Sequence, residues 1–281
     1  MSSPSTTSEL HDAANRANAS FWDELCGTQL AQSLGITDSS PESLKRFDDW
    51  YFAFYPYLPR HIPFHEMRHA EVLEVGLGYG TVAQRLAESC ATYQGLDVAA
   101  GPVQMVNHRL RTNGLSGSAS QGSVLAAPFE DEKFDYVVAI GCFHHTGDVQ
   151  RAVDESWRML KAGGQLIFMV YYAYSYRRWC SAPVATLNSL GRERFSWRFQ
   201  LQQAARERAA YDANATGTAA PITEFLSKRA LSRICKRFTD VDMTLENASP
   251  EGMFRSFSRE TLIASPLSRY AGLDVYLRAW K

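Results

Sequence analysis

The chain has 281 residues, of which 45% are hydrophobic and 21% are charged. This composition supports a sizeable core and excludes disorder for the bulk of the chain. With 29 Lys and Arg against 30 Asp and Glu, the net charge is -1. No nucleic-acid partner is expected, because dedicated nucleic-acid-binding domains carry a basic excess.

The sequence carries no predicted membrane span and no signal peptide. The longest uncharged stretch near the middle, 162–176, is shorter than the about 20 apolar residues that a spanning helix needs. The N-terminus, MSSPSTTSELHD, lacks a basic and an apolar region. The five cysteines are scattered, without a CxxC pair or a Cys/His metal spacing. We therefore expect reduced thiols and a cytoplasmic protein that is a monomer or homodimer.

Residues 1–66 are predicted to form a helical, aromatic-rich N-terminal segment. A helix is expected over 18–34. Ser40 and Pro41 favour the start of a second helix, with the serine as N-cap and the proline in the first turn. The stretch FDDWYFAFYPYLP from Phe47 holds more rings than one helix face needs. These rings either pack against the next domain or form a lid over a pocket.

Residues 67–172 alternate strands and helices and form the predicted core. Strands are expected at 71–75, 92–98, 116–122, 134–140 and 165–172, and helices at 81–90, 101–112 and 148–160. Apolar strands that alternate with helices form a parallel sheet covered on both faces.

Two further segments follow the core. Residues 173–220 are predicted to be a helical insertion that caps the carboxyl edge of the sheet. Residues 221–281 complete the sheet, with a helix at 223–237 and strands at 239–245 and 273–280. We predict a seven-stranded, mainly parallel, doubly wound α/β sheet with an antiparallel last strand, and a lid built from the first segment and the insertion.

A glycine loop, EVGLGYG at 74–80, lies between the first strand and the helix after it. Glycines allow a tight turn and a close ligand, and the helix N-terminus offers free N–H groups. Asp97 ends the second strand, 17 residues after Gly80, where an acid can bind the hydroxyls of a ribose. No Lys or Arg stands in the loop, so a nucleoside without phosphates suits it. The loop alone is shared with dinucleotide enzymes.

The motifs EVGLGYG (74–80), GLDV (95–98), FDYVVAIGCFHHTGD (134–148) and LKAGGQLIFMVYY (160–172) together resemble class I S-adenosylmethionine-dependent methyltransferases. The resemblance covers about 70–172, and it implies the class I methyltransferase fold and S-adenosylmethionine as cofactor. It implies cofactor contacts from the strand ends and the loops that follow them: Glu74, Gly76, Gly78, Tyr79, Gly80, Asp97, Val98, Gly122, Ser123, Val124, Ile140, Gly141 and Cys142.

The resemblance implies particular roles for Glu74 and for the position of Ser123. It implies that Glu74 organises the loop and binds the amino group of the cofactor. Ser123 stands where the family often has an aspartate near the adenine. In this chain the adenine amino group would then be held by the Ser123 hydroxyl or by the backbone alone.

His144 and His145 follow the fourth strand, beyond whose carboxyl end ligands of open α/β sheets bind. A histidine with a pKa near ~6.5 can accept a proton at neutral pH. Either one of them is the catalytic base, His145 ahead of His144, or both orient their loop. No acidic residue or further histidine near the pair completes a metal site, so no metal is expected.

Candidate acceptor-binding residues are Tyr51, Tyr55, Tyr172, Tyr176 and Arg177. Each tyrosine either contacts the acceptor or packs in the core. The stretch 177–208 carries seven arginines and two glutamates, and guanidinium groups bind carboxylates and phosphates. The stretch therefore predicts an anionic acceptor, and the alternative is an exposed, charged helix.

Two functions follow from these observations. The first is a methyltransferase that acts on a small-molecule or lipid- or carrier-linked acceptor, with oxygen favoured over nitrogen or carbon. The second is a non-methylating use of the scaffold, as a nucleotide-cofactor-binding protein or an NAD-dependent oxidoreductase. The spacing GxGxG in place of GxGxxG disfavours the oxidoreductase.

Overall fold

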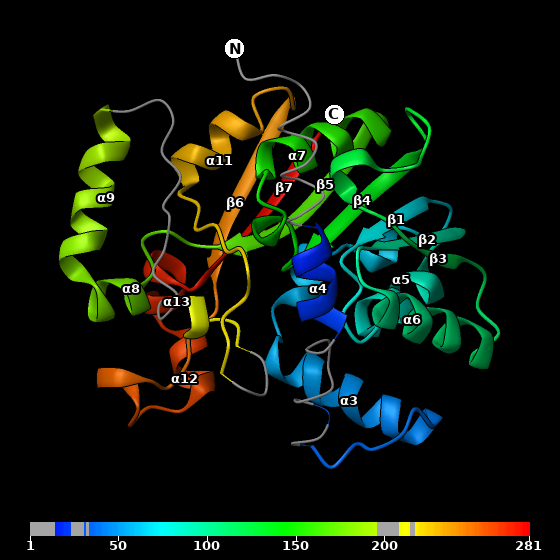
Figure 1. The fold of residues 1–281 in the computed structure, drawn as a ribbon, viewed down its shortest axis with the longest axis horizontal. Helices are drawn as coiled ribbons and strands as arrows, with labels where there is room; N and C mark the ends of the chain where they lie inside the picture. The colour runs from blue at the N-terminus through cyan, green and yellow to red at the C-terminus, as the bar shows by residue number, and fades with distance from the viewer. Residues whose placement is uncertain (1–14, 24–30, 32–33, 196–207, 214–216) are drawn as a thin grey trace.

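The computed structural model describes residues 15–23, 31, 34–195, 208–213 and 217–281. A seven-stranded sheet of order β3-β2-β1-β4-β5-β7-β6 lies at its centre (Figure 1). The strands are β1 (Glu71–Val75), β2 (Thr92–Asp97), β3 (Ser118–Gln121), β4 (Phe134–Ile140), β5 (Leu160–Tyr171), β6 (Asp240–Glu246) and β7 (Asp274–Trp280). Pairs among β1 to β5 are parallel, and β7 is antiparallel to both β5 and β6. The predicted sheet and its antiparallel last strand are confirmed.

Helices lie between the strands in the sequence and flank the sheet. The α-helices of the described residues include α3 (Pro41–Phe54), α4 (Leu58–His61), α5 (Thr81–Ser89), α6 (Ala100–Thr112), α7 (Val149–Met159), α8 (Tyr176–Ser181), α9 (Pro183–Phe195), α11 (Lys228–Ile234), α12 (Arg259–Ala264) and α13 (Pro266–Ala271). A further helix covers 15–23. Short 3-10 turns are η1 (Phe64–Glu66), η2 (Val124–Ala126), η3 (Phe143–His145) and η4 (Gly252–Phe254).

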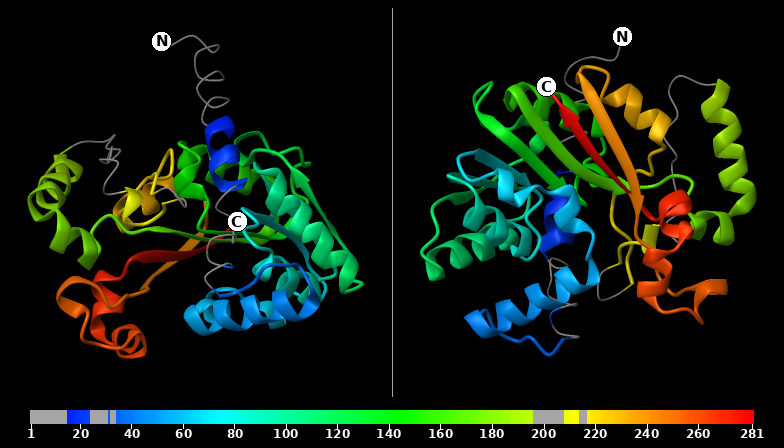
Figure 2. Two further views of the ribbon diagram at one scale, coloured as in Figure 1. Left: turned by 60° about the horizontal axis from the view of Figure 1, so that its bottom comes forward. Right: turned by 180° about the vertical axis from the view of Figure 1, so that it is seen from behind.

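The two faces of the sheet are buried by different helices. Val72, Val138 and Ile167 pack in one core with residues of α4, α5 and α6. Their neighbours Leu73 and Val137 pack in a second core with residues of α7 and α11. Adjacent residues of a strand point to opposite faces, so the continuous apolar runs of β4 and β5 supply both cores. Figures 1 and 2 show α5 and α6 beside β1, β2 and β3, away from α7 and α11.

The second predicted helix starts as expected. The Oγ atom of Ser40 accepts a hydrogen bond from the backbone N–H of Ser43, and α3 begins at Pro41. The first helix is described over 15–23, three residues earlier than expected. Most of the rest of its predicted range, 24–30 and 32–33, lies outside the described residues.

Two predicted boundaries are wrong. α11 begins at Lys228 rather than at 223, because Ser227 caps it by accepting a hydrogen bond from the N–H of Ala230. Leu226 forms a bridge with Tyr172 instead of a helical turn. β5 begins at Leu160, which pairs with Phe134 and was expected to end a helix.

The C-terminal part also holds α12 and α13, which the sequence analysis missed. Each follows a serine N-cap, Ser258 and Ser265, and Pro266 occupies the first turn of α13. In the predicted cap, α8 and α9 lie to one side of the sheet (Figure 1), and 196–207 and 214–216 lie outside the described residues. No helix in the described ranges has the length and apolarity needed to cross a membrane.

Candidate functional site

A pocket of about 180 Å³ lies where β1, β2, β3 and β4 end. Parallel strands bring their carboxyl ends to one edge of the sheet, so loops distant in sequence meet there. Ten of the predicted cofactor contacts line this pocket: Gly76, Gly78, Asp97, Val98, Gly122, Ser123, Val124, Ile140, Gly141 and Cys142.

The glycines of the loop have separate tasks. A side chain on Gly76 would place its Cβ 2.4 Å from the Cβ of Cys142, so a glycine is needed for the loops after β1 and β4 to touch. Gly78 has a φ of 51° and no atom within 4 Å of an added Cβ, which leaves its backbone open to the pocket. Gly80, with a φ of 80°, is the N-cap of α5.

Asp97 ties the end of β2 to the glycine loop. Its two carboxylate oxygens accept hydrogen bonds from the N–H groups of Leu77 (2.7 Å) and Ala99 (2.8 Å). Burial raises the pKa of Asp97, and these backbone donors oppose that shift. The carboxylate is thus fixed at the pocket wall by the backbone, with lone pairs left for a ligand.

Glu74, Tyr79 and Gly80 belong to the loop but not to the pocket wall. Glu74 is buried and accepts a hydrogen bond of 2.6 Å from the Tyr93 hydroxyl. Burial raises the pKa of Glu74 to about 8, and the bond from Tyr93 opposes this shift. The ring of Tyr79 packs 4.5 Å from that of Phe47.

The helix at 15–23 supplies pocket residues that the sequence analysis did not identify. Asn15, Asn18 and Trp22 line the pocket. The amide of Asn18 donates a hydrogen bond of 2.6 Å to the carbonyl oxygen of His145, and the ring of Trp22 lies 4.6 Å from the His145 ring. No motif marks these residues, because their role depends only on where the helix docks.

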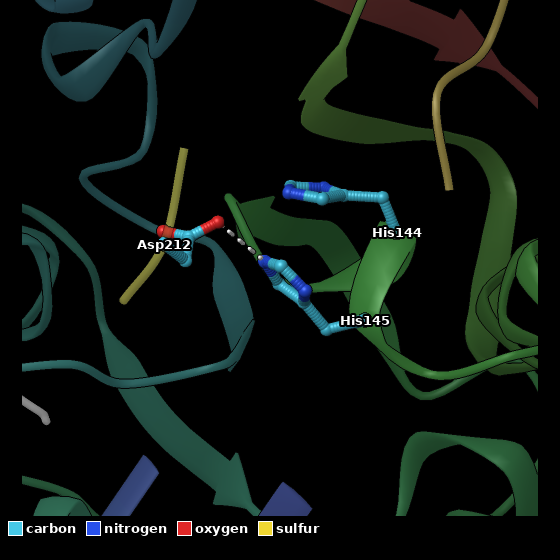
Figure 3. A group of neighbouring side chains, drawn as sticks. All are labelled: His144, His145 and Asp212. Carbon is cyan, nitrogen blue, oxygen red and sulfur yellow. Dashed lines mark ion pairs between the residues drawn. The ribbon is translucent and has the colours of Figure 1, made fainter. Parts of the chain in front are cut away.

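His145 lines the same pocket and is fixed by two neighbours. Its Nδ1 lies 2.7 Å from the carbonyl oxygen of Ile222. A carbonyl only accepts, so Nδ1 carries the proton. Its Nε2 lies 3.5 Å from Oδ2 of Asp212, whose Oδ1 accepts a hydrogen bond of 3.0 Å from the Tyr171 hydroxyl. Figure 3 shows both imidazoles extending toward this carboxylate.

His144 is fully buried, and neither of its ring nitrogens has a hydrogen-bond partner among the described residues. Its ring lies 4.1 Å from those of His145 and Tyr171. Burial lowers the pKa of both histidines, and the Asp212 carboxylate opposes this shift for His145.

The expectation that no acidic residue approaches the histidine pair is wrong. Asp212 comes from the predicted insertion, more than 60 residues away in the sequence. The aspartate stands in no recognisable motif, so no sequence signal connected it to the pair.

The five candidate acceptor residues do not line this pocket. The rings of Tyr51, in α3, and Tyr55, its C-cap, are tilted against each other with their centroids 5.0 Å apart. Tyr172 pairs with Leu226, as described above. The hydroxyl of Tyr176 donates a hydrogen bond of 3.1 Å to the carbonyl of Ser249, and the Nε of Arg177 lies 2.7 Å from a Glu251 carboxylate oxygen.

The match to a known domain agrees with this geometry. Residues 73–168 match the family model described as a methyltransferase domain. They span β1 to β5 and every strand end that forms the pocket. The chain contains a class I methyltransferase domain. This favours the methyltransferase over the oxidoreductase among the two alternatives.

Relatives of this methyltransferase domain are distant. The chain is 32% identical over 99 residues to the ubiquinone biosynthesis O-methyltransferase of Klebsiella pneumoniae, with 35% of this chain and 41% of that protein covered. It is 29% identical over 98 residues to the demethylmenaquinone methyltransferase of Tropheryma whipplei, with 34% and 40% covered. The matched part thus spans about 40% of the length of these curated relatives.

One solved structure shows the extent of the fold. The YcgJ protein of Bacillus subtilis aligns with a TM-score of 0.52 and 19% identity, over 81% of this chain and 98% of that chain. The fold likeness therefore reaches well beyond the residues of the methyltransferase domain match.

Proposed function

We propose that the protein is an S-adenosylmethionine-dependent methyltransferase that methylates a hydroxyl oxygen of a small-molecule or carrier-linked acceptor. The observation that carries this proposal is a shared cavity: the glycine loop, Asp97 and His145 line one pocket. A cofactor site and a group able to bind a proton therefore stand side by side.

The residues present fit the cofactor. Gly78 leaves room for a ligand against the loop, and Asp97 offers carboxylate lone pairs to a ribose. Ser123 keeps its hydroxyl at the wall, within 3.2 Å of Oδ1 of Asn15, which suits the adenine edge. We expect these residues to contact the ribose and the base of the cofactor.

The protein's task in methyl transfer is orientation, exclusion of water and removal of a proton. When bound, S-adenosylmethionine would supply an activated methyl group on its sulfonium sulfur. His144, His145 and Asp212 then promote loss of the proton from the acceptor hydroxyl. Trp22 and Asn18 hold His145 in place from the other side.

Oxygen is favoured by a relative's name. The Klebsiella relative is called an O-methyltransferase of ubiquinone biosynthesis, and a base-like group is needed chiefly where the acceptor must lose a proton. A neutral amine can attack without first losing a proton, so the histidine disfavours nitrogen, whereas methylation at carbon also releases a proton.

The anionic acceptor stays a prediction. Arg177 already pairs with Glu251, and its guanidinium carbon lies 4.4 Å from the centre of the Tyr211 ring. An anionic acceptor would compete with Glu251 for this arginine. A Michaelis constant for the acceptor that rises with salt would support the prediction, and a salt-independent constant would contradict it.

Calorimetry tests the cofactor. We expect S-adenosylmethionine and its demethylated product to bind one site per chain and NAD not to bind. Binding of NAD alone would overturn the proposal in favour of the oxidoreductase.

The acceptor is tested with cofactor carrying an isotope-labelled methyl group, incubated with metabolite extracts and followed by mass spectrometry. We expect a labelled methyl ether, and His145→Ala should lower its rate of formation by about 10²–10⁴. His65→Ala is the matched control, since His65 is highly exposed in η1. Equal rates for the two variants would remove the histidine from the mechanism.

A further inference from the structure

Three potential metal-ligand atoms lie close together beside the pocket, and none of them has a hydrogen-bond partner among the described residues. One nitrogen each of His144 and His145 and one carboxylate oxygen of Asp212 lie within 4.8 Å of one another. Nδ1 and Nε2 of His144, Nε2 of His145 and Oδ2 of Asp212 are all buried without a hydrogen-bond partner in the described part of the chain. Buried polar atoms without a partner are costly, and each calls for an explanation.

A single added proton would not give hydrogen-bond partners to all of these buried atoms. Since Nδ1 of His145 donates to the Ile222 carbonyl, Nε2 of a neutral His145 is an acceptor. It faces Oδ2 of Asp212, a second acceptor, at 3.5 Å. A proton between these two atoms would still leave both nitrogens of His144 without a partner. A multivalent cation would be bound by all three groups at once.

His145 and Asp212 make outer hydrogen bonds of the kind that metal-binding side chains usually make. A metal-binding histidine usually donates its other ring N–H to a carbonyl or carboxylate, and a ligating carboxylate is itself hydrogen-bonded. His145 donates to Ile222 in this way, and Asp212 accepts from Tyr171 through the oxygen that points away from the cluster. The outer contacts of a site are therefore already in place around two of the three ligands.

We propose that His144, His145 and Asp212 bind one divalent transition-metal ion, Zn²⁺ or an ion of similar preference, beside the methyl-transfer pocket. Two imidazoles and one carboxylate, with an open position, form a common catalytic ligand set for such ions. Ligand atoms about 2.0–2.2 Å from a tetrahedral ion lie about 3.4 Å apart. The pair of His145 and Asp212 has about this separation, and the ligand nitrogen of His144, within 4.8 Å of both, would have to approach them when the ion binds.

The catalytic consequence rests on the proposed function. A hydroxyl oxygen of the acceptor would occupy the open position of the metal ion, which lowers the hydroxyl pKa as it does for bound water. The hydroxyl proton leaves to solvent, and the resulting oxyanion is the nucleophile. The neutral ether that forms binds the metal more weakly and is released. The histidines then act as metal ligands rather than as direct proton acceptors.

Metal binding is measured without the cofactor, so that its result is independent of methyl transfer. The whole chain is stripped with a chelator and titrated with ZnCl₂ by calorimetry, and with Co²⁺ by visible absorption. We expect one ion per chain and Co²⁺ bands typical of low coordination number. Asp212→Asn keeps the size of the side chain and should lower affinity at least 100-fold, as should His144→Asn.

Two further variants sharpen the test. Tyr171→Phe removes only the outer contact to Asp212 and should lower affinity about tenfold, while His65→Ala should bind as the parent does. Thermal unfolding checks that the variants fold, and Zn²⁺ should raise the melting temperature of the parent but not of Asp212→Asn.

The result that overturns the inference is absence of stoichiometric binding, or binding that Asp212→Asn and His144→Asn leave unchanged. The latter would assign the metal to other side chains. Cofactor binding and turnover in fully chelated protein would also overturn the metal's catalytic role while leaving the proposed methyltransferase function intact. Zn²⁺ binding in a chain that does not bind S-adenosylmethionine would support the metal site and contradict the proposed methyltransferase function.

Discussion

Glu74 and Asp97 are both buried carboxylates at strand ends, yet their neighbours differ. Asp97 is held by two backbone N–H groups, which favour its ionised form. Glu74 has a single side-chain donor, Tyr93, and burial raises its pKa to about 8. The two acids therefore respond differently to pH and to substitution.

For Glu74 we predict a pH-dependent contribution to stability. Its folded-state pKa lies above the ordinary value of 4.5, so between these two values the unfolded chain gives up a proton that the folded state retains. The free energy of unfolding should thus fall as pH rises from 4.5 to about 8, by at most ~1.4 kcal/mol per pH unit. Glu74→Gln should reduce this slope in urea denaturation of the ligand-free protein. Parallel pH profiles for parent and variant would contradict the prediction.

For Asp97 we predict a large effect on cofactor binding. Hydrogen bonds to a charged group contribute about 1.5–3 kcal/mol each, so Asp97→Ala should weaken S-adenosylmethionine binding by roughly tenfold to a thousandfold in calorimetry. Asp97→Asn, which retains one acceptor oxygen for the backbone, controls for the anchoring of Leu77. Unchanged affinity in a folded Asp97→Ala variant would remove Asp97 from the ribose site.

At the scale of elements, the helix at 15–23 and η3 form one side of the pocket together. They are joined by the bond from Asn18 to the His145 carbonyl and by the ring contact between Trp22 and His145. The helix therefore lines the proposed cofactor pocket and also contacts the candidate catalytic residue His145. The aromatic stripe of α3, which suggested a lid, packs ring on ring and against the core that α4, α5 and α6 share, and the lid stays a prediction.

We predict that Trp22→Ala weakens S-adenosylmethionine binding about two- to tenfold, because aromatic ring contacts contribute ~0.5–1.5 kcal/mol. Trp22→Phe should restore most of the affinity. Trp50→Ala is the matched control, since Trp50 stacks on Phe54 in α3 and does not line the pocket. Equal loss in both tryptophan variants would show that the effect is general destabilisation.

At the scale of the whole molecule, the site is assembled from parts spread over the chain. The helix at 15–23, the glycine loop, η3 and Asp212 of the predicted insertion meet at one edge of the sheet. α9, in the same insertion, contributes no residue to the pocket and lies to one side (Figures 1 and 2).

This arrangement predicts an uneven response to the cofactor. S-adenosylmethionine should slow amide hydrogen exchange in 15–23 and 75–80, because residues of both segments line the proposed cofactor pocket, and leave exchange in α9 unchanged. Hydrogen-exchange mass spectrometry with and without cofactor measures this. Protection of α9 with none at 15–23 would assign the cover of the pocket to the insertion.

The sequence by itself determined the sheet and which strand ends line the pocket. Strand–helix alternation predicts a doubly wound sheet, and the carboxyl ends of parallel strands meet at one edge, so local motifs at 74–80, 97–98, 122–124 and 140–142 predict a common pocket. These are local patterns, readable within a few residues of each strand end.

Only the tertiary structure decided the surroundings of His144 and His145. Asp212 and Trp22 reach the histidines through the docking of distant segments, and neither stands in a motif that specifies its partner. Tyr176 and Arg177 follow β5 in the sequence but bind the C-terminal region through Ser249 and Glu251. Long-range packing sets these contacts, and residue spacing within one segment carries no record of which surface another segment will cover.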